Sequence, residues 1–139
     1  MNVVRVINAN PRHRRRHAET VRLVRSVLLA ERKKHAEIGV VFVDDKKMLG
    51  LNSAFLRHRY PTDVLSFPLS SKRDVPLEGE VYVNLDQAKR QARDYSVEFS
   101  EETHRLVIHG VLHLLGYDDA TRSQQQQMRQ LEDRYLQSV

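Results

Sequence analysis

The sequence predicts a single domain of the α/β or α+β class, and three observations support this prediction. The 139 residues are enough to bury an ordinary hydrophobic core, and without cysteines the fold cannot depend on disulfides. Four short strand-like segments are interleaved with segments of helical periodicity. No internal repeat and no linker-like stretch divides the chain. We therefore expect one domain over residues 1–139, with four strands and about five helices.

The predicted strands are short and rich in β-branched residues. They cover residues 2–8, residues 38–43, a stretch that ends at Pro68, and residues 79–84. The second is a nearly continuous apolar run, which is typical of a strand covered on both faces. Pro68 lacks an amide hydrogen, so we expect the third strand at an edge of the sheet or at a strand terminus.

The five predicted helices differ in their polarity. The first, which ends near Arg32, has an apolar face of Val21, Val24 and Leu28 and a basic exterior. The others cover residues 45–55, 86–95, 100–115 and 121–136. Their expected N-terminal residues are Asp44 or Asp45, Asp86, Ser100 and Thr121. We expect Ala88, Ala92 and Tyr95 to lie in register on the third helix, and Met128, Leu131 and Tyr135 to face inward on the fifth.

The fourth predicted helix carries His109 and His113. Residues four apart lie on one face of a helix, one turn apart, so both imidazoles can point at one metal ion. The other positions are nearly all apolar, which is typical of a buried helix. Buried histidines need partners, because an unpaired buried polar group costs about 1–3 kcal/mol. Hydrogen bonds to carbonyl groups, or a heme or structural contact, are the alternatives to a metal.

A third metal ligand is expected just after this helix. Gly116 can adopt the left-handed conformation that often ends a helix, and the following turn can bring Asp119 onto the same ion. Asp118 is the local alternative. The spacing resembles that of the metzincin zinc proteases, whose pattern begins His-Glu-x-x-His. Gly110 stands at the position of that Glu and cannot act as a general base, so a metalloprotease is a remote alternative.

The charge of the chain is unevenly distributed. The first 35 residues hold 10 Lys and Arg against 2 acids, and the rest hold 13 against 16. Such polarity favours a polyanionic partner such as RNA, although a well-solvated helix face is an alternative. The candidate RNA-binding residues lie on the first helix and in the basic loop before the third strand: Arg15, Arg22, Arg25, Arg57, His58 and Arg59.

Membrane segments are not predicted. No apolar run approaches the roughly 20 residues of a membrane span, and the first residues lack the charged start and apolar stretch of a signal peptide. We expect a cytoplasmic protein that does not contact the membrane, and the sequence gives no indication of its oligomeric state.

Three motifs, taken together and in this order, resemble the YbeY family of bacterial endoribonucleases and rRNA maturation factors. They are PTDVLSFP at residues 61–68, GEVYV at 79–83 and HGVLHLLGYD at 109–118. The resemblance runs from about residue 38 to the end. It implies a small α/β domain with a mixed sheet, a zinc ion on one face and hydrolytic cleavage of single-stranded RNA. It also implies a role in maturing the 3′ end of small-subunit rRNA and in ribosome quality control, with the small ribosomal subunit, a ribosomal protein and an assembly GTPase as partners.

The sequence departs from the family pattern at two positions. The usual third ligand is a histidine, and its position here is Asp119. A carboxylate is an accepted zinc ligand, so one zinc per chain is expected, but its charge makes bound water less acidic or favours a harder divalent metal. Many members have an arginine directly after the aromatic residue of the preceding helix, where this chain has Leu56. We expect Arg57 or Arg59 to stabilise the phosphate in its place.

The predicted mechanism is metal-assisted hydrolysis of an RNA phosphodiester, with open metal positions for water and a phosphate oxygen. No general base is identifiable: His58 and His104 are candidates that we expect to be surface histidines. The alternative from another class is a non-catalytic ribosome-assembly module that binds RNA and holds a structural metal.

Overall fold

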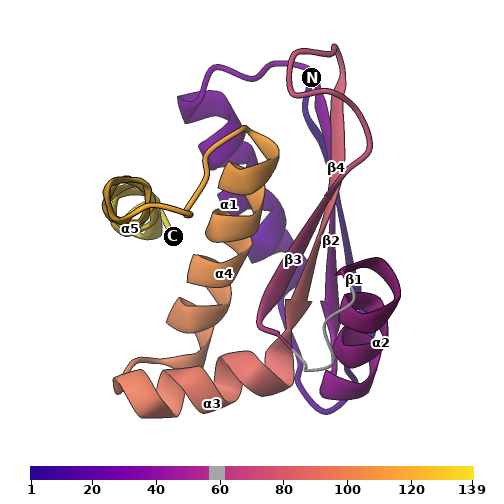
Figure 1. Ribbon diagram of the computed structural model, residues 1–139, viewed down its shortest axis with the longest axis vertical. Helices are drawn as coiled ribbons and strands as arrows, with labels where there is room; N and C mark the ends of the chain where they lie inside the picture. Colours follow the sequence, from indigo (N-terminus) through magenta and orange to yellow (C-terminus); the bar gives the residue numbers. More distant parts are fainter. Residues whose placement is uncertain (57–61) are drawn as a thin grey trace.

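The computed structural model describes residues 1–56 and 62–139. These residues form four strands and five helices, which alternate along the chain (Figure 1). The strands are β1 (Val3–Asn8), β2 (Ala36–Val43), β3 (Val64–Pro68) and β4 (Leu77–Asn84). The helices are α1 (His17–Ala30), α2 (Asp45–Leu56), α3 (Leu85–Tyr95), α4 (Phe99–Leu114) and α5 (Arg122–Leu136).

The strands form one mixed sheet in the order β1-β2-β4-β3. β1, β2 and β4 are parallel, and β3 runs antiparallel to β4. β3 is therefore an edge strand, as Pro68 predicts, since that residue could not donate to a further strand. The fold class expected from the sequence, a single domain with a mixed four-stranded sheet and five helices, is confirmed.

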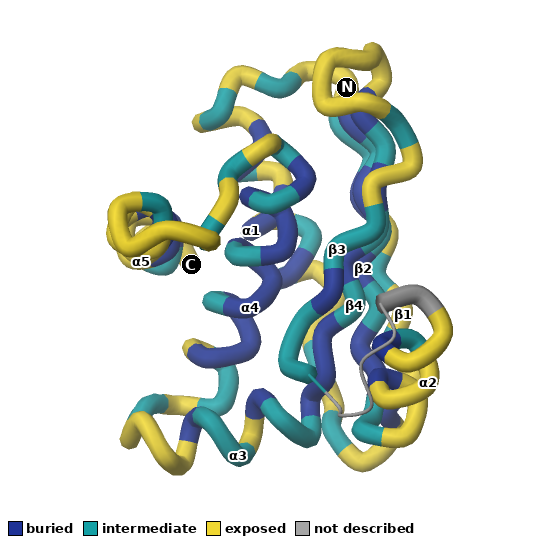
Figure 2. Tube along the Cα trace, viewed as in Figure 1, coloured by how far each residue is buried: buried dark blue, intermediate teal, exposed yellow. Residues whose placement is uncertain are grey.

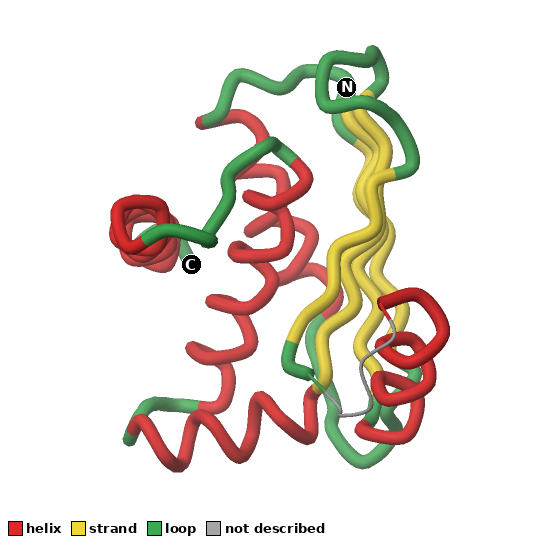
Figure 3. Tube along the Cα trace, in the orientation of Figure 1, coloured by secondary structure: helices red, strands yellow, loops and turns green. Residues whose placement is uncertain are grey.

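Helices cover the two faces of the sheet unequally. α1 and α4 pack on one face, α2 lies on the other, and α5 packs outside α4 (Figures 1 and 3). The main core lies between the sheet and α1 and α4, and a smaller cluster of Val43, Met48 and Leu65 lies beneath α2. The prediction that β2 is covered on both faces is only partly right. Gly39 and Val41 are half-buried, because the short helix α2 covers only part of that face.

α4 is the central helix of the domain. It contacts α1, α3, α5, β3 and β4, and nearly all of its middle turns are buried (Figure 2). The buried residues include Leu106, Val107, Ile108, Val111, Leu112 and Leu114. The apolar sequence around the two histidines therefore reflects contacts on nearly every side of this helix, as expected.

Two helix starts differ from the prediction by one or two residues. α3 begins at Leu85, because the side chain of Asn84 accepts hydrogen bonds from the amides of Asp86 and Gln87. Asn84 therefore ends β4 and caps α3, and Asp86 is not the cap. α4 begins at Phe99 and not at Ser100, after Glu98, whose side chain makes no capping hydrogen bond.

The other helix predictions hold, with one exception. Asp44 accepts from the amide of Lys47 at 2.9 Å and caps α2. Thr121 and Gln124 form a reciprocal capping box at the start of α5. The three predicted inward residues of α5 are buried. Tyr95, expected in register with buried Ala88 and Ala92, is instead 62% exposed at the end of α3. Among the described residues, no helix combines the length and apolarity needed to cross a membrane.

Candidate metal centre

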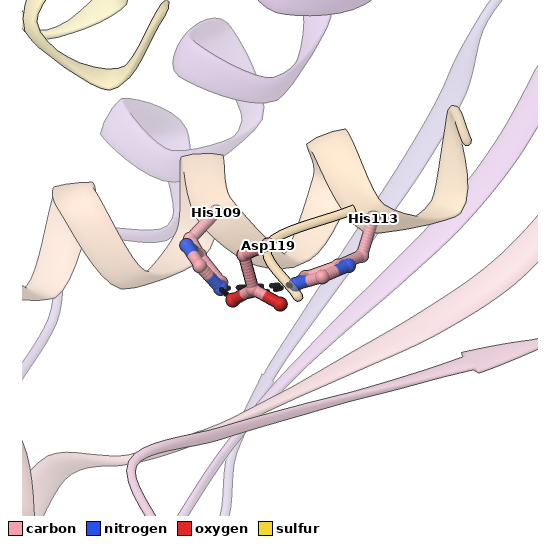
Figure 4. Close-up of side chains that lie close together, drawn as sticks. All are labelled: His109, His113 and Asp119. Atoms are coloured by element: carbon pink, nitrogen blue, oxygen red, sulfur yellow. Dashed lines mark hydrogen bonds and ion pairs between the residues drawn. The ribbon is translucent and has the colours of Figure 1, made fainter. Parts of the chain in front are cut away.

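The end of α4 positions the candidate site. Gly116 has φ +103°, and the amides of Gly116 and Tyr117 donate to the carbonyls of His113 and Leu112, both at 3.0 Å. This is the Schellman arrangement, in which a glycine in the left-handed region closes the helix and reverses the chain. The reversal returns Asp119 to the face of α4 that carries His109 and His113 (Figure 4).

Three donor atoms converge at this point. The Nε2 atoms of His109 and His113 lie 3.0 Å apart, and Oδ2 of Asp119 lies 3.2 Å and 3.4 Å from them. All three residues are half-buried, and they form the group of potential metal ligands found among the described residues. The prediction that these three side chains meet is confirmed. Asp118, the alternative, is exposed and does not join them.

The separations of these atoms suit a small divalent ion. Zinc binds imidazole nitrogen and carboxylate oxygen at about 2.0–2.2 Å, and tetrahedral geometry then places neighbouring donor atoms about 3.3 Å apart. The observed 3.0–3.4 Å therefore needs little adjustment. Two imidazoles and one carboxylate form a donor set used by catalytic zinc sites, which keep a fourth position open. The residues present thus fit a metal, and the donor set alone does not choose between zinc and a harder ion.

A buried carboxylate fixes the orientation of His109. Oε2 of Glu132, on α5, lies 2.7 Å from Nδ1 of His109, and the Glu132 side chain is only 6% exposed. An ionised carboxylate can only accept a hydrogen bond, so Nδ1 carries the proton and Nε2 presents its lone pair to the site. Arg105 holds Glu132 in turn, with Nη1 donating to Oε1 at 3.0 Å and Nη2 donating to Asp133 at 2.8 Å.

The acids around His109 also change its protonation. Burial by itself lowers the pKa of His109, but the hydrogen bond and charge of Glu132, with the charge of Asp119, outweigh burial and raise it. Bound metal competes with that proton, because only the neutral imidazole binds a metal ion.

Gly110, between the two histidines, has a packing role. A Cβ at this position would lie 2.3 Å from Cγ1 of Val81. The carbonyl of Gly110 accepts from Oγ of Ser66 at 2.8 Å. Glycine therefore lets α4 approach β3 and β4 closely, and a glutamate has no room here. The position that supplies the general base in His-Glu-x-x-His proteases faces the sheet, which removes the structural basis for the metalloprotease alternative.

Two hollows flank the three ligands. A groove of about 420 Å³ runs between β3 and α4. It is lined by Val64, Leu65, Ser66 and Pro68 from β3, together with His109, His113 and Asp119. A second hollow of about 260 Å³ lies where α3, α4 and α5 meet and includes Asp63, Glu102, Arg105, Asp119 and Glu132. Burial raises the pKa of Glu102, although a hydrogen bond from Gln91 opposes the shift. The groove is open to an extended ligand beside the candidate metal position.

The other predicted site residues are basic side chains, and only some of them lie in the described part of the chain. Arg57, His58 and Arg59 lie outside the described residues. Arg15 lies over the ring of Phe99 at 5.0 Å, and Arg22 and Arg25 are exposed on α1. None of these three α1-region arginines lines either hollow.

One histidine was predicted wrongly. His104 is only 4% exposed, so it is not a surface histidine. It lies five residues before His109 on α4 and lines neither hollow, which makes it unsuitable as a general base.

Glu132 and Arg105 were missed by sequence reasoning, although one signal was present. Glu132 lies four residues after Met128 and directly after Leu131, on the inward side of α5. A carboxylate at an inward position of an amphipathic helix needs a buried partner. The sequence alone does not say that His109 is that partner, because α4 and α5 are joined by a turn whose course depends on Gly116.

Known proteins resemble this chain over nearly its whole length. The family model described as Endoribonuclease YbeY matches residues 6–139. A protein named Endoribonuclease YbeY from Chlorobium phaeovibrioides is 43% identical over 119 residues, which are 86% of this chain and 79% of that protein. One of the same name from Salinibacter ruber is 40% identical over 124 residues, 84% of this chain and 79% of that protein. A solution structure from Thermotoga maritima, 25% identical, has a TM-score of 0.67 and covers 97% of this chain and 87% of its own.

Proposed function

Because this chain belongs to the YbeY endoribonuclease family, we propose that it is a metal-dependent endoribonuclease that hydrolyses phosphodiester bonds in single-stranded RNA. The observation that carries the metal dependence is the convergence of His109, His113 and Asp119 at 3.0–3.4 Å, with Glu132 behind His109. Family membership supports RNA as the substrate, and the groove beside these ligands supports an extended strand.

The three ligands would hold one ion per chain. A bound divalent ion supplies Lewis-acid chemistry, which acidifies water and neutralises charge on phosphoryl oxygens. Zinc is the proposed metal, because His and Asp donors at these separations suit it. The carboxylate of Asp119, in place of a third imidazole, adds negative charge and also suits a harder divalent ion.

The protein's own groups would position the RNA. Glu132 holds the neutral imidazole of His109 with Nε2 directed into the site. We propose that Arg57 or Arg59 stabilises the charge on the phosphate. One of them would supply the cation that many family members have at the position of Leu56. The proposed RNA-binding residues include His58 and, on α1 or just before it, Arg15, Arg22 and Arg25.

The proposed cellular role follows the family resemblance. It comprises maturation of the 3′ end of small-subunit rRNA and ribosome quality control, in the cytoplasm. The proposed partners are single-stranded rRNA, the small ribosomal subunit, a ribosomal protein and an assembly GTPase.

Metal content tests the site before activity does. The dialysed, untagged chain should contain about one ion per chain by elemental analysis, and His113→Ala should contain none. Absence of metal in the wild type, even after zinc is offered, would contradict the hydrolase proposal. It would favour the alternative of a non-catalytic ribosome-assembly module.

The paired aspartates provide a matched control for cleavage. Asp119→Ala should abolish metal binding and reduce cleavage of a labelled single-stranded RNA to background. Asp118→Ala should retain both, because Asp118 is exposed and outside the ligand group. Equal cleavage by both variants would show that contaminating ribonuclease, or another site, produces the signal.

A further inference from the structure

We propose that a basic cluster next to the candidate metal centre binds the phosphate backbone of the RNA. The cluster consists of Arg32, Lys33, Lys34, Lys72 and Arg73, with His35 beside them. This inference rests on the proposed ribonuclease function and names a surface on which the substrate lies.

Two loops form the basic cluster. One joins α1 to β2 and the other joins β3 to β4, and both lie at the end of the sheet where the parallel strands begin (Figure 1). The register pairs Ala36 with Leu77, and the amide of Leu77 donates to the carbonyl of His35 at 3.1 Å. The loops are thus held side by side, and they enclose a hollow of about 270 Å³.

In the described part of the chain, the cations of this cluster form no ion pairs. Among the described residues, none of its five Lys and Arg side chains has a carboxylate within ion-pair distance, whereas Arg90 and Arg105 each have one or two. The acid that lines the hollow, Asp74, accepts from the backbone amide of Ser71 at 2.8 Å. Five cations that line one hollow with a single acid create a positive potential that attracts a polyanion.

The backbone at Arg32 gives a second, independent indication. Arg32 has φ +63°, in the left-handed region where glycine or asparagine is usual after a helix. An arginine there costs about 1–2 kcal/mol in backbone energy. The fold therefore keeps a less suitable residue at the end of α1, and its exposed guanidinium lies in the basic cluster. Such a mismatch between residue type and backbone conformation is expected where the side chain has a function.

The basic cluster adjoins the metal centre through Lys72. A Cβ placed on Gly116 would lie 2.9 Å from Cδ of Lys72, so this side chain rests on the turn that separates His113 from Asp119. The groove beside the ligands ends at Pro68, the last residue of β3, and the loop after β3 carries Lys72 and Arg73. An RNA strand in the groove can therefore continue over the basic cluster without leaving the surface.

The exterior of α1 is less well placed for the same strand. α1 packs against α4 and β1, whereas the groove lies between α4 and β3 at the opposite edge of the sheet. Arg22 and Arg25 are exposed on that helix. A strand that lies in the groove therefore passes over the basic cluster and not over the exterior of α1.

The test compares two triple variants that each remove three exposed positive charges. Lys34→Gln/Lys72→Gln/Arg73→Gln alters the basic cluster, and Lys46→Gln/Lys47→Gln/Arg93→Gln alters exposed positions on α2 and α3 that line neither hollow beside the ligands. Affinity for a fluorescent single-stranded RNA is measured by anisotropy at several salt concentrations, with EDTA present to prevent cleavage. The cluster variant should bind about tenfold or more weakly, and its slope of log affinity against log salt should fall by about 2, because each phosphate contact contributes roughly 0.7. The variant on α2 and α3 should keep most of the affinity and most of the salt dependence.

The outcomes separate this inference from the proposed function. Equal weakening by both triple variants would indicate a general charge effect and would overturn the inference, as would unchanged binding by the cluster variant. Metal content and cleavage are measured on the same preparations. If the wild type holds metal and cleaves RNA but the cluster variant binds normally, this inference alone fails. If the wild type holds no metal, the proposed function fails, and the anisotropy still decides the role of the cluster.

Discussion

At the scale of single residues, the hydrogen bond between Glu132 and His109 is the contact that orients a candidate metal ligand before any metal binds. A buried carboxylate 2.7 Å from Nδ1 fixes both the tautomer and the ring orientation of the imidazole. Arg105 satisfies the other oxygen of Glu132 and offsets the cost of burying its charge. In the described part of the chain, neither His113 nor Asp119 is held by a buried charged group of this kind, and their side chains are 28% and 43% exposed. Metal affinity should therefore depend strongly on Glu132.

Replacing Glu132 tests this dependence. Glu132→Gln keeps the size and an acceptor oxygen but loses the charge, and we expect metal affinity to fall about tenfold; Glu132→Ala should approach a 100-fold loss. A chelator competition titration measures both values. Asp133→Asn is the control, because Asp133 contacts Arg105 but not His109. Equal affinities for the wild type and Glu132→Ala would show that Glu132 does not position the ligand.

At the scale of elements, the distance between α4 and the sheet is set by Gly110. The helix lies close enough to β4 that a single methyl group would meet Val81. This contact also brings β3 beside the histidines, so the groove and the ligand set share one wall. The glycine that distinguishes this helix from that of a metzincin protease is thus a requirement of helix–sheet packing.

Gly110→Ala should destabilise the domain by about 1–3 kcal/mol, the usual cost of overpacking a close-packed core. Urea unfolding followed by circular dichroism measures this change. Gly50→Ala on α2 is the matched control, since a Cβ there meets nothing within 4 Å. That substitution should be neutral or stabilise by about 0.5–1 kcal/mol, because alanine favours a helix over glycine. A stable Gly110→Ala variant would mean that α4 can move away from the sheet at little cost.

At the scale of the whole molecule, charge and burial are distributed unevenly. Paired acids and bases lie at the metal centre and at the Asp45–Arg90 pair, whereas unpaired cations gather in the basic cluster at one end of the sheet. His104 is a buried residue of α4, and among the described residues it has no carboxylate within ion-pair distance, unlike His109. The global stability of the domain should therefore respond to pH through this histidine.

Burial lowers the pKa of His104 below its ordinary value of 6.5; the charge of Glu19 raises it and that of Arg15 lowers it. Below that ordinary value the unfolded chain binds a proton that the folded chain resists, so stability falls as pH decreases through and below 6.5. His109 and Glu102, whose pKa values are raised, act in the opposite direction.

Comparing the pH dependence of the unfolding free energy between the wild type and His104→Gln isolates the contribution of His104. Glutamine does not titrate, so the unfolding free energy of the variant should decline less steeply from pH 7 towards acid. Denaturant unfolding at several pH values measures both slopes. Parallel slopes would exclude His104 as a source of acid sensitivity.

The sequence by itself was sufficient for the features that depend on local periodicity and capping. The alternation of apolar segments predicts the strands and helices, Pro68 predicts an edge strand, and the spacing of His109, His113 and Asp119 around Gly116 predicts the ligand group. These depend on the geometry of one helix and one turn, which neighbouring residues determine. The cap of α3 is Asn84 and not Asp86, because Asn84 also ends β4 and the length of that strand depends on its pairing with β2.

Only the tertiary structure decided which distant residues meet. Glu132 reaches His109 because α5 packs on α4, Gly110 is needed because Val81 lies opposite it, and His104 is buried because helices surround α4. The basic cluster likewise forms from two loops some forty residues apart along the chain, which the parallel pairing of β2 with β4 brings together. Such contacts depend on the packing of whole elements, and packing is a property of the complete fold and not of any single segment.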